Sequence, residues 1–316
     1  MQKRTPADIV LGIACGSLLA VAGPASGQAW TPEARSGSVM LSFQHLEVDD
    51  HFFSVDVTGV DLGDGYIGRG KRADLGGIEA RSLQLRVDYG LSDRLALSAA
   101  LPYISSKYSG RQPEGEIDDG SYHSAFQDLA VQLRYKAIDG PLVVTPFLAY
   151  VMPTHDYEIV GHAAIGRNLR ESRIGSYFGL PLYPIFTYLQ ASYSYTFVEE
   201  VLGVSTDRSD LTLAVGYQAT PAITVQLFGS HLDTRGGLDW ITDFDPRLHD
   251  GDHGLDEDQV FHLHDQLSWA EATRAGISLI YSTTRNLDFD LSFSKTFAGE
   301  NAHGATSTTF SVIWSF

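Results

Sequence analysis

The end of the chain, residues 305–316, alternates small polar side chains with apolar or aromatic ones and closes on a phenylalanine. Successive side chains of a β-strand point to opposite faces. One face of this segment would carry Phe310, Val312, Trp314 and Phe316, and the other mostly serine and threonine. Such a strand would invite aggregation at the edge of a soluble sheet, whereas a membrane barrel has lipid outside and a polar lumen inside. The pattern predicts the closing strand of an outer-membrane barrel, with a half-buried strand of a soluble sandwich as the alternative.

The same alternation recurs along most of the chain. Six further segments keep their apolar residues on one face: 83–89, 95–101, 129–135, 211–217, 275–281 and 287–293. Five others alternate less clearly: 38–48, 142–151, 174–180, 185–197 and 223–233. Together with the closing strand they predict an all-β fold, a transmembrane antiparallel up-and-down β-barrel of about twelve strands, an even number as bacterial barrels have.

The connections between these segments alternate in length. Short turns are expected at 90–94, 137–141, 181–184, 218–222 and 282–286, and mostly longer loops at 58–75, 105–124, 153–172, 199–206, 234–268 and 298–304. Outer-membrane barrels have short periplasmic turns and longer extracellular loops, so both termini are expected on the periplasmic side. Four strands end on a tyrosine at the short-turn side, which predicts an aromatic girdle at the inner membrane boundary: Tyr89, Tyr135, Tyr217 and Tyr281.

The first residues have the features of a secretory signal. Lys3 and Arg4 precede an apolar run over 9–22, and small residues at 25–27 or 27–29 offer cleavage sites. We expect residues 1–29 to be a cleaved signal peptide and residues 30–316 to be one barrel domain. Lipidation at Cys15 is a disfavoured alternative because the residues before it fit a lipidation box poorly. Since Cys15 is the only cysteine, the mature chain would have neither disulfides nor thiolate metal sites.

Composition narrows the possible partners. The formal charge is −17, and losing the signal peptide makes the chain one unit more negative, which argues against nucleic-acid binding. After cleavage no apolar run approaches the roughly 20 residues of a spanning helix, so insertion would be by strands. We expect the cell outer membrane as the location, with the lipid bilayer and lipopolysaccharide as partners. The barrel assembly machinery would recognise the strand ending in Phe316, and no cofactor is expected.

The polar face of the strands supplies candidate lumen residues. The charged ones are Arg86, Asp88, Asp128, Arg134, Lys136, Asp210 and Arg274. The arginines could line a narrow path and attract anionic groups. They could instead be neutralised by the aspartates as interior ion pairs, which is the interpretation that we favour.

Enzymatic and metal sites are weakly supported. Some barrel lipases combine His, Ser and an acid, but here only His231 with Ser230 and His45 with Ser42 lie near one another, and adjacency in sequence is not triad geometry. The acidic, His-containing stretch 239–265 includes weak metal-ligand candidates, namely Asp250, Asp252, Asp256 and Asp258. It lacks an EF-hand pattern, so we favour a solvated loop and expect no metal site.

One hairpin resembles a known family. Residues 89–97, Y-G-L-S-D-R-L-A-L, continue to Leu101-Pro102-Tyr103 and are similar to a hairpin signature of the meta-pathway phenol-degradation family of outer-membrane proteins. Residues 125–129, A-F-Q-D-L, resemble that family's G-x-G-D-L element with both glycines replaced. The resemblance implies a transporter-like β-barrel associated with aromatic compound catabolism.

These observations favour a porin-like outer-membrane channel or facilitator of a Gram-negative cell. It would give passive passage to small solutes, with aromatic or hydrophobic compounds among the candidates. The alternative is a non-transport surface protein whose acidic loop binds a cation or a partner. A barrel hydrolase is the least favoured interpretation, and we expect no enzyme activity.

Overall fold

The computed structural model describes most of the barrel and part of its loops. The described residues are 28–54, 57–58, 66–67, 69–70, 72–73, 76–110, 115–185, 187–239, 263–283 and 286–316. Two predictions fall outside these residues. They are the weak metal-ligand candidates, Asp250, Asp252, Asp256 and Asp258, and residues 1–27 of the expected signal peptide. No helix in the described part of the chain is long and apolar enough to cross a membrane.

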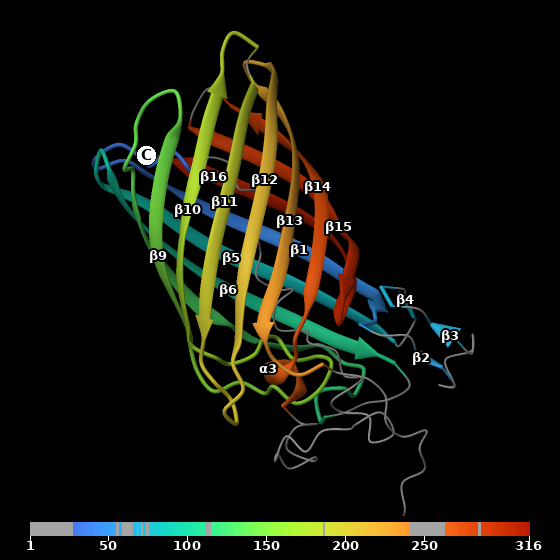
Figure 1. Ribbon diagram of the computed structural model, residues 1–316. Helices are drawn as coiled ribbons and strands as arrows, with labels where there is room; N and C mark the ends of the chain where they lie inside the picture. Colours follow the sequence, from blue (N-terminus) through green and yellow to red (C-terminus); the bar gives the residue numbers. More distant parts are fainter. Residues whose placement is uncertain are drawn as a thin grey trace, which may run out of the picture.

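The described strands form one antiparallel barrel (Figure 1). In chain order they are β1 (Gly37–Phe52), β5 (Gly77–Ser92), β6 (Leu95–Ser109), β7 (His123–Phe126), β8 (Asp128–Tyr135), β9 (Val143–Pro153), β10 (Glu171–Leu182), β11 (Thr187–Val198), β12 (Thr206–Thr220), β13 (Ile223–Gly236), β14 (Glu271–Ser282), β15 (Leu287–Glu300) and β16 (Ala302–Ser315). Each pairs with its neighbour in sequence, and β7 with β8 makes one strand of the wall.

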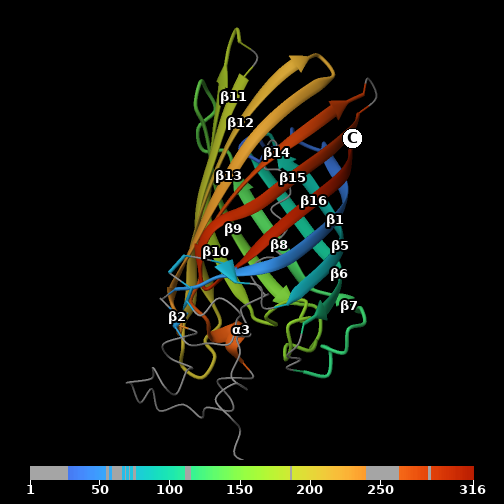
Figure 2. The same cartoon turned by 90° about the vertical axis from the view of Figure 1, so that its right-hand side faces the viewer.

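The barrel closes between its first and last strands. β1 pairs with β16 from Ser38–Ser315 to Phe52–Ala302, and on its other side it pairs with β5 (Figure 2). The amide of Gly37 and the carbonyl of Phe316 continue this ladder at 2.9 Å. Closure leaves no free sheet edge, as a strand structure in lipid requires. The prediction of a closed up-and-down barrel of twelve strands is confirmed.

The outer face of the barrel is apolar, as the alternation predicts. Leucines on the predicted lipid side, such as Leu85, Leu213 and Leu279, are exposed. Tyr89, Tyr135, Tyr217 and Tyr281 are also exposed, near the ends of β5, β8, β12 and β14. A second set of exposed aromatic residues lies toward the opposite ends of the strands: Tyr103, Phe126, Tyr150, Phe197 and Phe297. The two aromatic sets bracket the apolar band, an arrangement typical of membrane barrels.

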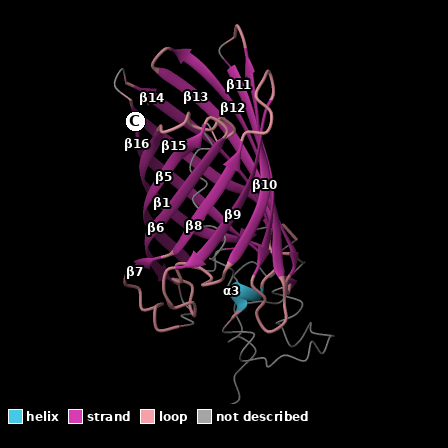
Figure 3. Cartoon of the chain, turned by 90° about the vertical axis from the view of Figure 1, so that its left-hand side faces the viewer, coloured by secondary structure: helices cyan, strands magenta, loops and turns pink. Residues whose placement is uncertain are grey.

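Both termini of the barrel lie at the end with short turns, which we call the short-turn end (Figure 1). The opposite, long-loop end carries the four-residue helix α3 (His264–Leu267) (Figure 3). The short strands β2 (Val57–Thr58), β3 (Tyr66–Ile67) and β4 (Arg72–Ala73) lie at the same end (Figure 1). One predicted long loop is absent: residues 298–304 belong to β15 and β16, joined by Asn301 alone with a φ of 47°. Asparagine tolerates this left-handed conformation, so the two strands continue up to a tight turn at Asn301. The polar residues there had predicted a longer loop.

A bulge interrupts the wall between β7 and β8. Tyr103 pairs with Phe126 and Ala100 with Ala130, so three residues, 127–129, oppose two residues of β6. Pro102 has no amide to donate, and its carbonyl instead accepts the Gln127 amide at 3.0 Å. The extra residue lets Gln127 and Asp128 both engage a loop inside the barrel, whereas neighbours in a regular strand would point to opposite sides.

The two faces of β12 offer a test of this fold. Leu213 is 55 % exposed on the outer face, while its neighbour Thr212 faces the lumen. We expect Leu213→Arg to lower the free energy of unfolding in lipid vesicles by about 2–4 kcal/mol if it lies near the bilayer midplane. Thr212→Arg is the matched control and should cost much less. Equal losses in denaturant titrations of the two variants would contradict the assigned faces.

Candidate functional site: the lumen

An N-terminal segment, residues 28–32, lies inside the barrel at the short-turn end. The Arg134 guanidinium donates to the Gln28 carbonyl at 3.0 Å, and the Thr145 hydroxyl donates to the Ala29 carbonyl at 2.6 Å. Arg134 and Thr145 come from β8 and β9, so two neighbouring strands hold consecutive carbonyls of the segment. This binds the segment by its backbone to the inner wall.

Side-chain packing fixes the same segment. Ala29 is buried in a cluster with Phe147 and Tyr177, and Trp30 packs against it. The Trp30 ring also meets the Tyr188 ring edge to face, with 6.0 Å between centroids. A Cβ at Gly179 would lie 2.8 Å from the Ala29 Cβ and from the Trp30 ring. Glycine is therefore required on β10 for the segment to approach the wall this closely.

The residues after the segment are tied to the turn between β5 and β6. The Arg35 amide donates to the Gly90 carbonyl at 2.8 Å, and the Gly90 amide donates to the Ser36 carbonyl at 2.9 Å. The Ala34 amide donates to an Asp93 carboxylate oxygen at 3.1 Å. The chain thus has a fixed pivot at the rim, from which residues 28–32 reach into the lumen.

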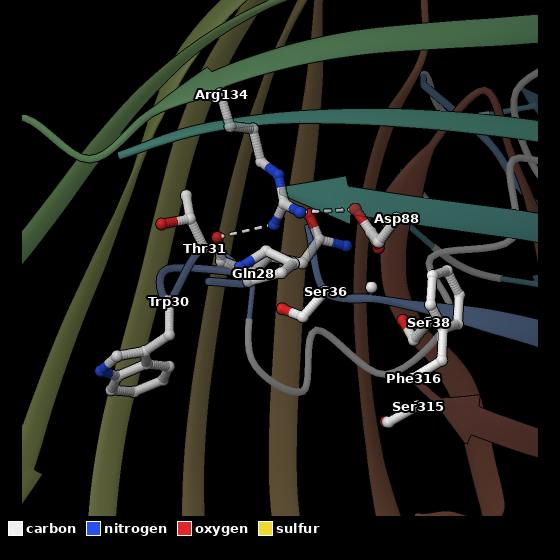
Figure 4. Close-up of a pocket in the computed structure, with 11 residues that line it drawn as sticks. Gln28, Trp30, Thr31, Ser36, Ser38, Asp88, Arg134, Ser315 and Phe316 are labelled. Atoms are coloured by element: carbon white, nitrogen blue, oxygen red, sulfur yellow. Dashed lines mark hydrogen bonds and ion pairs between the residues drawn. The ribbon is translucent and has the colours of Figure 1, made fainter. Parts of the chain in front are cut away.

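A cavity of about 340 Å³ lies between this segment and the wall (Figure 4). Its lining includes Trp30, Ser38, Arg134 and Phe316, so aromatic and charged groups face the same space. Figure 4 shows Arg134 reaching from β8 toward both Gln28 and Asp88. The cavity has the size of a small-solute pocket.

Beside the cavity, one carboxylate is shared by two arginines. Asp88 lies 3.0 Å from Arg86 and 2.5 Å from Arg134, and it also accepts a hydrogen bond from Ser98. Arg134 is only 2 % exposed. Two guanidinium groups against one carboxylate leave a local excess of one positive charge at this mouth of the barrel.

A second cluster of charges lies nearer the long-loop end. Glu171 accepts hydrogen bonds from Arg167 at 2.9 Å and from Arg208 at 2.6 Å, and Arg173 approaches it to 3.8 Å. Glu171, Arg173 and Arg208 come from β10 and β12, while Arg167 comes from the preceding loop. The cluster fastens that loop to the inner wall. The cluster could not be predicted from the sequence, because Glu171 falls in a predicted loop and Arg208 precedes the clearly alternating part of β12.

The remaining predicted lumen residues have different surroundings. Asp128 accepts a hydrogen bond from the Tyr157 hydroxyl at 2.7 Å rather than from an arginine. Lys136 lies beyond the end of β8 and pairs with Asp139 at 2.9 Å in the following turn. Asp210 and Arg274 lie on β12 and β14, and neither forms an ion pair with any residue that the structure describes. The seven candidates therefore form no single site.

A loop lies inside the lumen at the long-loop end, packed against the inner wall, and we call residues 154–170 the inner loop. Its buried Tyr157, Ala163 and Ile165 pack against apolar residues on β1, β5, β6 and β16. The Gln127 side chain donates to the Ile165 carbonyl at 2.7 Å, so the bulge holds the loop directly. Burial, reinforced by the Asp128 carboxylate, raises the pKa of Tyr157, which therefore stays a neutral donor.

Four buried histidines surround the inner loop and α3. The rings of His51 on β1 and His303 on β16 lie 4.5 Å apart, and His162 of the inner loop stacks near Tyr108 at 4.3 Å. His264 lies 3.0 Å from Asp265 within α3. Burial alone would raise the pKa of Asp265, but the charges of His264, His303 and His162 outweigh it and lower that pKa. The cluster contributes no metal site, because no group of His, Cys, Asp and Glu among the described residues is arranged to hold an ion.

The residues weighed for hydrolase chemistry do not come together. His231 contacts Thr273 at 2.9 Å, whereas its neighbour Ser230 lies on the other face of β13. His45 contacts Glu47 at 3.1 Å, and Ser42 instead donates to Ser311 across the closing pair of strands. Strand alternation thus separates both His and Ser pairs.

Comparison with solved structures confirms the fold. No protein-family model matches the chain, and no curated protein does. The structure is similar to an outer membrane channel from Pseudomonas putida F1, with a TM-score of 0.65 and 13 % identity over 92 % of this chain and 98 % of that one. It is also similar to the translocator domain of the autotransporter NalP from Neisseria meningitidis, with a TM-score of 0.50 and 10 % identity over 90 % of each chain. The fold is that of an outer-membrane β-barrel. At these identities the likeness extends to the fold and leaves the resemblance to the phenol-degradation family a prediction.

The histidine cluster predicts a pH-dependent inner loop. Neutral rings can lie side by side, but two unit charges 4.5 Å apart repel by about 4 kcal/mol at an effective dielectric constant of 20. Exposed histidines titrate near a pKa of about 6.5, so the closed arrangement is stable above that pH and loses stability below it. The favourable His264–Asp265 pair offsets only one of the four charges.

We expect Ala164→Cys, at a buried position of the inner loop, to react several-fold faster with dithiodipyridine at pH 5 than at pH 7.5. A free cysteine peptide corrects for the reagent. His303→Gln should remove most of this pH dependence, whereas His123→Gln should keep it because His123 is paired with Asp119 on the surface. The same pH profile in all three backgrounds would contradict the role of the cluster.

Proposed function

We propose that this chain is an outer-membrane channel for the passive passage of small solutes, held shut at its periplasmic mouth by residues 28–32. The support is the closed barrel with a polar inner wall, its likeness in fold to a protein described as an outer membrane channel, and the cavity beside Arg134. Aromatic or otherwise apolar small molecules are the proposed solutes, because Trp30 and Phe316 line the same cavity as Arg134.

The observation that carries this proposal is the N-terminal segment inside the lumen. Two hydrogen bonds, one aromatic contact and a small hydrophobic cluster hold it there. Interactions of this kind contribute about 1 kcal/mol each. Displacing the segment therefore costs only a few such contributions and leaves the backbone pairing of the strands intact. A polypeptide held this way can act as a gate, since its loss opens the mouth without disturbing the strands.

The position of the segment bears on where the chain is processed. We propose that cleavage follows Gly27, the first of the two possible sites, so that Gln28 and Ala29 remain in the mature protein. Removal of residues 1–29 would eliminate both backbone contacts to Arg134 and Thr145. The mature chain would then begin inside the barrel that it closes, on the periplasmic side of the outer membrane.

The surface-binding alternative depends on residues 234–268, most of which lie outside the described residues. No described feature favours it over the channel. The hydrolase alternative is not supported either, because the candidate His and Ser pairs lie on opposite faces of their strands.

Planar-bilayer recordings test the gate. We expect the mature barrel to conduct rarely or in small steps, and deletion of 28–32 to increase both the step size and the open fraction. Trp30→Ala should give a partial increase, whereas Tyr183→Ala should have no effect because Tyr183 is 80 % exposed on a turn at the same end. A silent barrel after deletion of 28–32, with its fold verified by heat-modifiable gel mobility, would contradict the proposal.

Ion selectivity tests the charges at this mouth. Arg86 and Arg134 outnumber Asp88, so the double variant Arg86→Ala/Arg134→Ala should shift the reversal potential in a KCl gradient toward cation selectivity. Lys136→Ala is the control, since Lys136 pairs with Asp139 outside the strand. An unchanged reversal potential in a conducting double variant would show that solutes do not pass these arginines.

A further inference from the structure

The arginines on the inner wall differ in one respect. Arg86 and Arg134 contact Asp88, while Arg173 and Arg208 contact Glu171. Arg274, on β14, forms no ion pair with any described residue. A guanidinium group keeps its charge at any physiological pH, and a charge away from bulk water requires a counter-charge or polar partners. Arg274 is thus the uncompensated cation of the described lumen wall.

Hydroxyl groups surround Arg274 on the same face. Ser230 on β13 lies directly opposite it on one side, and Thr296 on β15 lies opposite it on the other. Thr212, which pairs with Ser230, extends this row to β12. Hydroxyls can donate hydrogen bonds to an anion beside a guanidinium, and together they form a surface suited to an oxyanion.

No described acidic residue forms an ion pair with Arg274. Asp210, on the same face of β12, lies two strands away. Asp290, on β15, is the lumen carboxylate nearest to it along that strand. It lies six positions from Thr296, roughly 20 Å toward the short-turn end at the rise of a β-strand. Asp290 accepts a hydrogen bond from Ser278 at 2.5 Å. Its charge is therefore too distant to neutralise Arg274.

An aromatic ring adjoins the charge. Phe228 on β13 pairs with Gly276, two residues from Arg274 on the same face of β14. A Cβ at position 276 would lie 2.4 Å from the Phe228 ring, so the absence of a side chain lets that ring lie across β14 on the inner wall. Arg274 and the position covered by this ring are therefore two residues apart on the lumen face of β14.

We propose that Arg274, Ser230, Thr296 and Phe228 form a subsite for small organic carboxylates within the channel. The carboxylate would accept hydrogen bonds from the guanidinium in the paired geometry that arginine favours, and the apolar part of the ligand would pack on Phe228. This subsite rests on the proposed channel function and adds a solute class to it. It lies away from the Asp88 cluster, whose arginines are already paired.

Calorimetric titration of the full mature barrel in detergent tests the subsite without requiring conduction. We expect benzoate to bind one site saturably, more tightly than acetate or inorganic phosphate. Arg274→Gln should weaken benzoate binding at least about tenfold, since a hydrogen bond to a charged group is lost. Lys295→Gln is the matched control, because Lys295 lies next to Ala275 and is exposed on the outer face of β15.

Two further variants keep the test decisive. Phe228→Leu should weaken the binding of benzoate more than that of acetate. Arg274→Lys keeps the positive charge but loses the paired N–H donors of the guanidinium, so it should bind benzoate with intermediate affinity. This variant serves as the test if Arg274→Gln fails to fold. Benzoate binding that is absent, or equal in the Arg274→Gln and wild-type barrels, would overturn the subsite, as would phosphate binding as tight as benzoate. A barrel that binds benzoate but never conducts would instead refute the channel while leaving the subsite standing.

Discussion

The pairing of β1 with β16 is the constraint on which the rest of the structure depends. In a lipid environment every backbone amide and carbonyl must find its partner within the protein, and only a closed ladder provides this for strands. The register from Ser38–Ser315 to Phe52–Ala302 achieves it and fixes which side chains face inward. Once that register is set, every polar residue of the inner wall has its place, and among the faces of the described strands it is the lumen face that can carry varied polar chemistry.

Charges in the lumen are arranged in local clusters rather than spread evenly. One cluster, around Asp88, lies beside the N-terminal segment, and the other, around Glu171, holds the inner loop. In both, arginines outnumber the carboxylate, and in both a segment outside the strands is attached through an arginine. The ion pairs therefore do more than neutralise buried charge, because they position the two segments that narrow the lumen. Under the proposed channel function, the opening would change by movement of one of these segments while the wall stays rigid.

Strand positions and faces could be predicted from the sequence because a period of two is a local property. The face on which Leu213 or Tyr217 lies follows from the few residues on either side of it. The tight turn at Asn301 could not be predicted, because a polar stretch predicts a loop. The alternation of apolar and polar residues gives no information on the left-handed conformation of a single asparagine. The N-terminal segment was also missed. Its contacts with Arg134, Thr145 and Tyr188 join residues more than a hundred positions apart. The local pattern of residues 28–32 does not predict such contacts.

The central claim is that residues 28–32 lie in the lumen and control its periplasmic mouth. The one cysteine of the chain, Cys15, lies in the expected signal peptide, so the single variant Ala29→Cys can report on the segment directly. Ala29 is fully buried against Phe147 and Tyr177. We predict that a small methanethiosulfonate reagent modifies this cysteine much more slowly than a free cysteine peptide, and that modification increases the single-channel current because the added group displaces the segment. Modification as fast as that of the free peptide, or a current that modification leaves unchanged, would contradict the account.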